Sequence, residues 1–450
     1  MSRLMISVSG IRGIVGETLT PDVIVNFAEA YGTFCGPGKI VVGSDTRITG
    51  HVVKHALLAG LYSVGCDVID VGICPTPTVQ MATEKLKANG GIIITASHNP
   101  IQWNALKLLA ADGLFLDAEQ GQKVIELAET KNFRLAAYDA VGHASTYADA
   151  IFDHEQAVLD LPYINIEKIQ AKKYKVVVDC VNGAGSVMLP AYLEKFGCEV
   201  IPINCTPDGR FPHIPEPVPE NLTQLSDKVR ETAADIGFAV DPDSDRLALI
   251  SNEGIPLGEE YTLALAIQFM LSRKKGKVVI NASTSLASED VAKQMGAEVI
   301  RTKVGEIHVA KKMREVHAVV GGEGNGGVIL PDVHLGRDAI VGIALILQHL
   351  ADLDLPISEI CRRLPQYVIT KKKIELTSAD TTSILNKLVE NHRNEMIDRI
   401  DGVKFLRPGA WVQVRASNTE PILRIMSEAP SAAESVALCD QFINEIKRLL

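Results

Sequence analysis

The sequence has no apolar run long enough to span a membrane and no sign of a targeting segment. The run from Ala339 to Leu347 is far shorter than the roughly 20 residues that a helix needs to cross a bilayer. The first residues, MSRLMISVSGIRG, contain no apolar core of a secretory signal. We therefore expect a cytoplasmic protein without a membrane partner.

The sequence also lacks paired cysteines and an excess of positive charge. Its eight cysteines are scattered with no CxxC pair, which fits a reducing compartment better than a disulfide framework. The net charge of -10 argues against a nucleic acid partner, because phosphate backbones are bound through excess Lys and Arg. A small anionic ligand is still allowed, since one local basic cluster can hold it. With 450 residues, 46% of them hydrophobic, the chain is typical of a globular protein of several domains.

One structural unit occurs three times in the chain. Each copy opens with a β-branched run that ends in a small polar loop, and these runs begin at Gly38, Tyr174 and Gly276. A helical stretch follows and ends at a glycine, where a second strand begins, at Gly65, Gly197 and Gly296. The pattern predicts a triplicated βαβ unit, and therefore an α/β fold with buried parallel strands.

Each copy continues into a third apolar run that ends in an unusual loop: GGIIITASHNP, DIGFAVDPDSDR and HAVVGGEGNGG. Ligands of open α/β sheets gather beyond the carboxyl ends of the strands, so we expect these loops to line one cleft. After about residue 366 the pattern changes to an α+β arrangement. We predict three α/β domains with mixed sheets and a C-terminal α+β domain, with four loops around a central cleft, divided as 1–150, 151–250, 251–365 and 366–450.

The first loop, TASHNP, places Ser97 and His98 directly after a buried strand. A serine before a turn fixed by Asn99 and Pro100 can be exposed and held rigidly, as a nucleophile must be. The same residues can also form an ordinary serine turn or helix cap. Taken alone, this loop leaves both interpretations open.

The second loop, DPDSDR, spaces Asp241, Asp243 and Asp245 so that their carboxylates can converge on one hard cation. A calcium EF-hand begins similarly, but its sixth and twelfth positions are Gly and Glu, whereas this chain has Arg246 and Asn252. Three carboxylates beside a buried strand repel one another without a neutralising partner. We therefore favour a Mg²⁺ site over a solvated acidic turn, with Arg246 placed to reach a phosphate.

The third and fourth loops carry groups that suit a sugar phosphate. In GGEGNGG, Glu323 and Asn325 stand among five glycines, where a carboxylate and an amide can bind vicinal hydroxyls. In RASNTEP, guanidinium, hydroxyl and amide groups within five residues are similar to a phosphate nest. Each loop alone is also consistent with a plain turn. The residues of the fourth loop are Arg415, Ser417, Asn418 and Thr419.

Taken together, four motifs in this order resemble the α-D-phosphohexomutase family, which includes phosphoglucomutase, phosphomannomutase and phosphoglucosamine mutase. The motifs are SGIRG (9–13), TASHNP (95–100), DPDSDR (241–246) and R-x-S-x-T-E-P (415–421). The match covers essentially the whole chain. The resemblance implies four domains in a heart shape, with one loop from each domain lining a central cleft.

The resemblance also implies the chemistry. Ser97 would carry a phosphoryl group and donate it to the substrate, giving a hexose 1,6-bisphosphate that turns over in the cleft and returns its other phosphoryl group. Mg²⁺ would be held by Asp241, Asp243, Asp245 and an oxygen of the phosphorylated Ser97. Phosphoryl transfer needs mostly positioning and charge neutralisation, which suits this arrangement.

The remaining roles follow from the same resemblance. Arg12, Lys107 and His98 are the candidate general acids and bases, and Arg246 is a partner for the transferring phosphate. Glu323 and Asn325 would bind the sugar, while the phosphate that does not react would be held by Arg415, Ser417, Asn418 and Thr419.

Three departures from the family pattern limit what is carried over. The usual N-G-x-K after the serine loop is NALK here (104–107), so the glycine is lost while Lys107 is kept. Where many relatives have G-E-x-S-G-H, this chain has GEGNGG (322–327) and lacks the serine and histidine, which resembles archaeal-type and phosphoglucosamine mutase-like members. The last loop has Ala416 and Asn418 where Pro and Gly are common, and Asn tolerates the left-handed backbone of such a turn.

We expect a phosphohexomutase that interconverts hexose 1-phosphate and hexose 6-phosphate, favouring glucosamine phosphate over glucose and mannose phosphates. These sugars share the hydroxyls on carbons three and four that Glu323 can bind, so these residues do not indicate which substituent the site binds on carbon two. The domain after residue 366 argues against a phosphatase that forms a phosphoserine, because a hydrolase gains nothing from a second phosphate-binding site. A silent binding protein is disfavoured by the intact Ser97 and Lys107. We expect a sugar phosphate as partner, hexose 1,6-bisphosphate as activator, and a monomer or homodimer.

Overall fold

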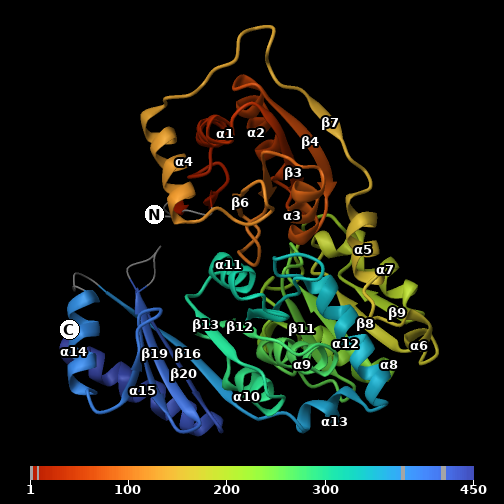
Figure 1. The fold of residues 1–450 in the computed structure, drawn as a ribbon, viewed down its shortest axis with the longest axis vertical. Helices are drawn as coiled ribbons and strands as arrows, with labels where there is room; N and C mark the ends of the chain where they lie inside the picture. The colour runs from red at the N-terminus through yellow and green to blue at the C-terminus, as the bar shows by residue number, and fades with distance from the viewer. Residues whose placement is uncertain (1–3, 8–9, 377–380, 417–421) are drawn as a thin grey trace.

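A computed structural model describes residues 4–7, 10–376, 381–416 and 422–450. The chain forms four successive parts, which Figure 1 shows from red at the N-terminus to blue at the C-terminus. The first part lies at the top of this view, the second and third pack together below it, and the fourth lies at the lower left. Within the described residues, no helix is long and apolar enough to cross a membrane.

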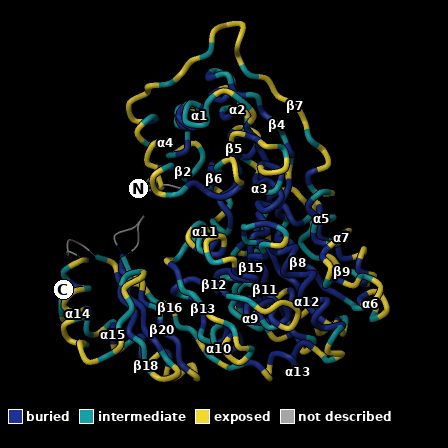
Figure 2. The backbone as a smooth tube through the Cα atoms, viewed as in Figure 1, coloured by how far each residue is buried: buried dark blue, intermediate teal, exposed yellow. Residues whose placement is uncertain are grey.

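The first part is built on a seven-stranded mixed sheet with the order β1-β2-β6-β5-β3-β4-β7. Its central strands β3, β4 and β5 are parallel, and β6 lies between β5 and β2, antiparallel to both. The strands are β1 (Met5–Ser7), β2 (Gly10–Ile14), β3 (Gly38–Ser44), β4 (Cys66–Ile73), β5 (Gly90–Ile94), β6 (Trp103–Leu109) and β7 (Ala144–Thr146). The helices are α1 (Pro21–Cys35), α2 (Gly50–Ser63), α3 (Thr76–Lys85) and α4 (Ala118–Thr130). The segment from α4 to β7 is mostly exposed (Figure 2).

The second and third parts each contain a four-stranded sheet, in the orders β11-β10-β8-β9 and β13-β12-β14-β15. The second part has β8 (Lys175–Asp179), β9 (Glu199–Ile203), β10 (Ile236–Val240), β11 (Leu247–Ser251), α5 (Ala150–Leu159), α6 (Ile166–Gln170), α7 (Leu189–Lys195) and α8 (Thr223–Thr232). The third has β12 (Val278–Asn281), β13 (Val299–Thr302), β14 (Val320–Glu323), β15 (Gly327–Ile329), α9 (Glu259–Arg273), α10 (Leu286–Gln294), α11 (Glu306–Val316), α12 (Ala339–Leu353) and α13 (Ile357–Arg362).

The three unusual loops occupy equivalent places in the three sheets. They connect β5 to β6, β10 to β11 and β14 to β15. In each case the first strand is parallel to its other neighbour, and the second returns beside it in the antiparallel direction. The predicted fold class, with three repeated mixed-sheet α/β units, is therefore confirmed.

The second and third parts share one hydrophobic core. The core runs from Val158 to Leu364 and includes both α9 and α12. Helix α12 is apolar on nearly all sides, and its residues are buried from Ala339 to Ala351. Asp338 caps this helix by accepting from the backbone N–H groups of Ile340 (2.8 Å) and Val341 (3.3 Å). The two loops that follow β10 and β14 are therefore supported by the same core.

The fourth part is a five-stranded antiparallel sheet with the order β16-β20-β19-β18-β17 and a helix packed against it. This agrees with the predicted α+β domain. Its elements are β16 (Val368–Glu375), α14 (Thr381–Asn391), β17 (Met396–Asp398), β18 (Val403–Arg407), β19 (Ala410–Ala416), β20 (Ile422–Ala429) and α15 (Ala432–Leu449). Arg415 lies near the described end of β19.

Candidate active site

Ser97 lies in the loop after β5 with its backbone in the left-handed region, at a φ of 48°. Such a conformation is unfavourable for a residue with a side chain and persists where the surroundings fix it. Arg47 supplies that restraint, because its guanidinium donates to the carbonyl oxygens of Ser97 (2.6 Å), Asn99 (2.7 Å) and Pro100 (2.8 Å). The Ser97 N–H in turn donates to Thr95 Oγ1 at 2.9 Å. These hydrogen bonds therefore fix the backbone at Ser97.

The Ser97 hydroxyl points at the acidic loop. Its Oγ donates to Asp241 Oδ2 at 2.7 Å, although the two residues are 144 positions apart. His98 Nδ1 lies 3.3 Å from the same Oγ. Burial, followed by the charges of Asp243 and Asp245, raises the pKa of Asp241 well above its usual range. The structure thus brings the predicted nucleophile and the predicted metal loop into direct contact.

The three aspartates of this loop are buried, and their candidate ligand oxygens lie within 4.8 Å of one another. Asp243 Oδ2 accepts from Lys107 Nζ at 2.6 Å, and Asp245 Oδ2 accepts from Arg337 Nη2 at 2.6 Å. Within the described residues, the other oxygens, Asp243 Oδ1 and Asp245 Oδ1, have no hydrogen-bond partner. A buried carboxylate oxygen without a partner is costly, so these oxygens fit the ligand set of a hard cation such as Mg²⁺.

The cationic candidates gather around Ser97. Arg12, on β2, donates from Nη1 to Asn99 Oδ1 at 2.6 Å, and Lys107 lies on the neighbouring β6. Burial lowers the pKa of Arg12, and burial together with the charges of Arg246 and Arg12 lowers the pKa of His98 well below its usual range. Burial alone would lower the pKa of Lys107, but the charges of two aspartates raise it. His98 is therefore neutral at neutral pH, while Lys107 stays charged.

Glu323 ends β14 with both carboxylate oxygens held. Its Oε1 accepts from Asn281 Nδ2 and from the Gly305 N–H, each at 2.8 Å, and its Oε2 accepts from Arg337 Nη1 at 2.9 Å. Although burial alone would raise it, the pKa of Glu323 is lowered, chiefly by the charge of Arg337. Asn325 follows in the same loop, where its Oδ1 accepts from the Gly327 N–H at 3.3 Å. Glu323 is thus a fixed carboxylate.

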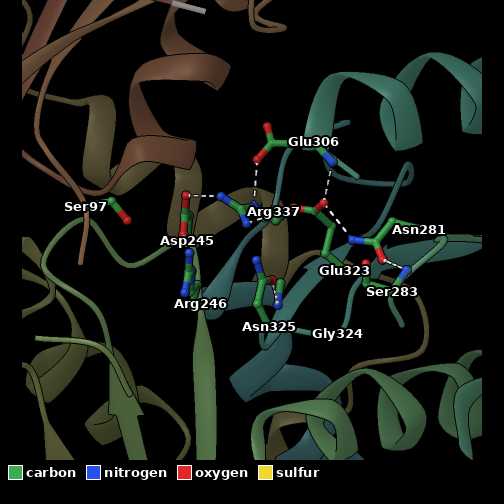
Figure 3. A network of polar contacts seen from close by, with 12 residues as sticks. Ser97, Asp245, Arg246, Asn281, Ser283, Glu306, Glu323, Gly324, Asn325 and Arg337 are labelled. Carbon is green, nitrogen blue, oxygen red and sulfur yellow. Dashed lines mark hydrogen bonds and ion pairs between the residues drawn. The ribbon is translucent and has the colours of Figure 1, made fainter. Parts of the chain in front are cut away.

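Arg337 connects the acidic loop (residues 241–246) to the sugar loop (residues 321–327), and sequence reasoning missed this arginine. Its guanidinium contacts Asp245 at 2.6 Å, Glu323 at 2.9 Å and Glu306 at 3.0 Å, as Figure 3 shows. Gln80 of the first part donates to Glu306 Oε1 at 2.9 Å, so the same network reaches three parts of the chain. Nothing in the surrounding LGRDA marks this arginine, because its partners come from distant segments.

Replacing Arg337 with Met is expected to lower the free energy of unfolding by about 3–5 kcal/mol, because the buried carboxylates lose their shared cation. Urea unfolding measures the change. Arg314→Met is the matched control, since Arg314 pairs with Asp112 on the surface, where such a pair contributes about 0–1 kcal/mol. Equal stability of the two variants would contradict the role given to Arg337.

One cleft of about 600 Å³ is lined by His98 of the Ser97 loop, by Glu323 and Arg337, and by residues of the fourth part. Its wall from the fourth part is cationic, with Arg415 on β19 and Lys373 and Arg424 paired across β16 and β20. The lysine run TKKKIEL, at the start of the predicted C-terminal domain, is the sequence signal for this cationic wall. The remaining predicted phosphate ligands, Ser417, Asn418 and Thr419, lie outside the described residues. The lining also includes His98, Arg246, Glu259, Glu260, Glu323, Gly324, Asn325 and Lys371.

The four parts match the four domain models of one enzyme family along nearly the whole chain. The models describe phosphoglucomutase/phosphomannomutase α/β/α domains I, II and III and the C-terminal domain, and they match residues 3–135, 145–254, 258–367 and 372–445. The chain therefore belongs to the phosphoglucomutase/phosphomannomutase family, as its motifs had suggested.

Individual relatives agree with this assignment. A Methanopyrus kandleri protein named "Probable phosphoglucosamine mutase" is 38% identical, over 98% of this chain and 97% of its own. A Thermococcus kodakarensis protein named "Phosphoglucomutase/phosphomannomutase" is 41% identical, over 94% of each chain. The crystal structure of a phosphoglucomutase/phosphomannomutase family protein from Burkholderia thailandensis superimposes with a TM-score of 0.85 at 29% identity, covering 99% of this chain and 98% of that one.

Proposed function

We propose that the protein is a phosphohexomutase that interconverts hexose 1-phosphate and hexose 6-phosphate, favouring glucosamine phosphate. The observation that carries this proposal is the single cleft that joins the Ser97 loop, the fixed Glu323 carboxylate and the cationic wall around Arg415. A mutase needs one place where a phosphoryl group moves and another that holds the second phosphate. The names of the relatives support both the activity and the lean toward glucosamine phosphate.

In this proposal Ser97 Oγ carries the transferable phosphoryl group. The P–O bond to Ser97 breaks as a bond to a substrate hydroxyl forms, and the hydroxyl proton moves to a nearby base. His98, neutral and 3.3 Å from Oγ, is suited to accept that proton, and Arg12 with its lowered pKa is the next candidate. Lys107, whose pKa is raised, remains a cation, and it is proposed to attract the phosphoryl oxygens together with the guanidinium of Arg246.

Asp241, Asp243 and Asp245 are proposed to hold Mg²⁺ together with an oxygen on phosphorylated Ser97. Asp243 Oδ1 and Asp245 Oδ1, which accept no hydrogen bond from the described residues, support this ligand set. When bound, the ion neutralises negative charge on the transferring group. Lys107 and Arg337 hold two of the aspartates in place, since Lys107 donates to Asp243 Oδ2 and Arg337 donates to Asp245 Oδ2.

The sugar is proposed to lie against Glu323 and Asn325, with its unreactive phosphate on Arg415, Ser417, Asn418 and Thr419. Hexose 1,6-bisphosphate would then be both the intermediate and the activator. Division of the chain at residues 150, 250 and 365 is retained as a proposal, as are a cytoplasmic location, a monomer or homodimer, and the lack of a nucleic acid or membrane partner. Light scattering would measure the mass in solution.

A product assay tests the function. Purified protein is incubated with Mg²⁺, a trace of bisphosphate and glucosamine, glucose or mannose 1-phosphate, and the products are separated. A mutase gives the 6-phosphate of the sugar. Free inorganic phosphate would instead identify a phosphatase, and unchanged substrate a binding protein.

Replacing Arg415 with Ala is expected to weaken substrate binding by about ten- to hundredfold, because charge-assisted hydrogen bonds to the distal phosphate are lost. The bisphosphate should also escape more often, so the variant should need a continuous supply of it. Activity against added bisphosphate measures both effects. Arg407→Ala is the control, since Arg407 lies in the same sheet but pairs with Glu395 at 2.9 Å. Unchanged Michaelis constants and bisphosphate dependence would refute the role of Arg415.

A further inference from the structure

Gly324, directly after Glu323, leaves room for a second carboxylate in the cleft. A Cβ atom at this position would lie 2.0 Å from Oε2 and 2.3 Å from Oε1 of Glu260. Backbone conformation does not explain the glycine, since the positive φ angles of this loop fall on Gly322 and Gly326. Gly324 therefore allows the Glu260 side chain to lie against the sugar loop.

The Glu260 carboxylate is held in place at one oxygen and faces the cleft. It belongs to the first turn of α9, and its Oε2 accepts from the Ser285 N–H at 2.9 Å. Among the described residues, no hydrogen bond to the other oxygen, Oε1, is found. Because Glu260 lines the cleft, Oε1 is available to a ligand. The adjacent Glu259 differs, because its carboxylate pairs with Lys371.

The charge around Glu260 is suited to a cation. Burial raises its pKa well above the usual range, with Lys371 only partly offsetting the effect. A positively charged substrate group beside the carboxylate would reduce this penalty. The cations of the fourth part, such as Lys373 and Arg415, line the same cleft, so a phosphate and an ammonium of one ligand can each find an opposite charge.

We propose that Glu260 is a specificity-determining residue that binds the substituent on carbon two of the sugar and favours an ammonium over a hydroxyl. This inference rests on the proposed function, in which Glu323 holds the hydroxyls on carbons three and four. Carbon two is next to carbon three, and Glu260 packs on the residue next to Glu323. A carboxylate distinguishes an ammonium from a hydroxyl through a charge-assisted hydrogen bond. The substrate class is therefore the 2-amino-2-deoxyhexose phosphates.

Glu260→Gln tests this assignment, because glutamine keeps the size of the side chain and an acceptor for the Ser285 N–H. The measurement is kcat/KM for the phosphates of glucosamine, glucose and N-acetylglucosamine. We expect the wild type to prefer glucosamine phosphate, and the variant to lose about ten- to hundredfold on that sugar. The two sugars with a neutral substituent should change by no more than about threefold, because they make no charge-assisted bond.

Two further variants keep the test decisive. Gly324→Ala should push the carboxylate aside and reproduce the selective loss, which answers the question even if Glu260→Gln does not fold. Glu259→Gln removes the same charge one position earlier, and it should affect all three sugars alike because it breaks the pair with Lys371. An unchanged preference in Glu260→Gln, or a wild type that prefers glucose phosphate, overturns the assignment. A wild type that converts no sugar phosphate overturns the proposed function instead.

Discussion

Replacing Ser97 with Ala is expected to reduce mutase turnover by at least about 10³-fold, because the residue that accepts and returns the phosphoryl group is removed. The protein should still fold. Arg47 holds the loop through backbone carbonyl oxygens, including that of residue 97 itself, and these bonds do not depend on the serine hydroxyl. The measurements are the rate of conversion of glucosamine 1-phosphate and the thermal unfolding curve.

Phosphorylation gives a second readout for the same variant. Wild-type protein treated with hexose 1,6-bisphosphate should carry one phosphoryl group by mass, and Ser97→Ala should carry none. Ser145→Ala is the control, since Ser145 lies on the exposed strand β7 and should be phosphorylated and active like the wild type. Turnover above a few per cent of the wild-type rate in Ser97→Ala would refute the nucleophile.

The fold and the position of the reactive loops could be predicted because both depend on local patterns. The buried runs before TASHNP and DPDSDR are short and apolar, and they form β5 and β10. The third strand, β14, begins at Val320 and extends into GGEGNGG as far as Glu323. Parallel strands present their carboxyl ends at one edge, so the loops after them could be assigned to one cleft from the sequence. Contact between Ser97 and Asp241 agrees with that expectation.

The supporting arginines could not be predicted in this way. Arg47 acts on the carbonyl oxygen of a residue 50 positions away, and Arg337 acts on Asp245 at a separation of 92. A long side chain that neutralises a distant group leaves no period or spacing in its own segment. Its position depends on how the domains pack, which local patterns do not specify. Glu260 was missed for the same reason, because its site is made by a glycine on another strand–loop unit.

The shared core of the second and third parts was also hidden in the sequence. The triplicated pattern predicted three α/β domains and carried no information on how their cores are divided. In the structure, α9 and α12 are buried on almost every side and contribute to one core that serves both sheets. The continuous apolar run of α12 is typical of a buried helix, but its periodicity does not predict which elements pack against it. The shared core supports both the acidic loop and the sugar loop, and Arg337 joins the two loops through Asp245 and Glu323.

Removing Mg²⁺ with EDTA is expected to abolish activity, and Asp243→Asn should need far more Mg²⁺ to recover it. Asp243 is held through Oδ2 by Lys107, while its Oδ1 has no partner within the described part of the chain. Although burial alone would raise it, the pKa of Asp243 is held below its usual range, chiefly by the charge of Lys107, so the group is ionised at neutral pH. Asparagine removes the charge that both the ion and Lys107 require.

Binding of the ion can be measured without catalysis. Mg²⁺ should raise the melting temperature of the wild type, because a ligand that binds the folded state stabilises it and three clustered carboxylates gain a counter-charge. The increase should be much smaller in Asp243→Asn, while Asp112→Asn, a change in an exposed ion pair, should respond like the wild type. Full activity in EDTA, or an equal increase in melting temperature in Asp243→Asn, would show that the acidic loop holds no ion. The charge of the loop would then have to be balanced by cations of the protein such as Lys107, Arg246 and Arg337, and Asp243 Oδ1 and Asp245 Oδ1 would stay buried without a hydrogen bond from the described residues.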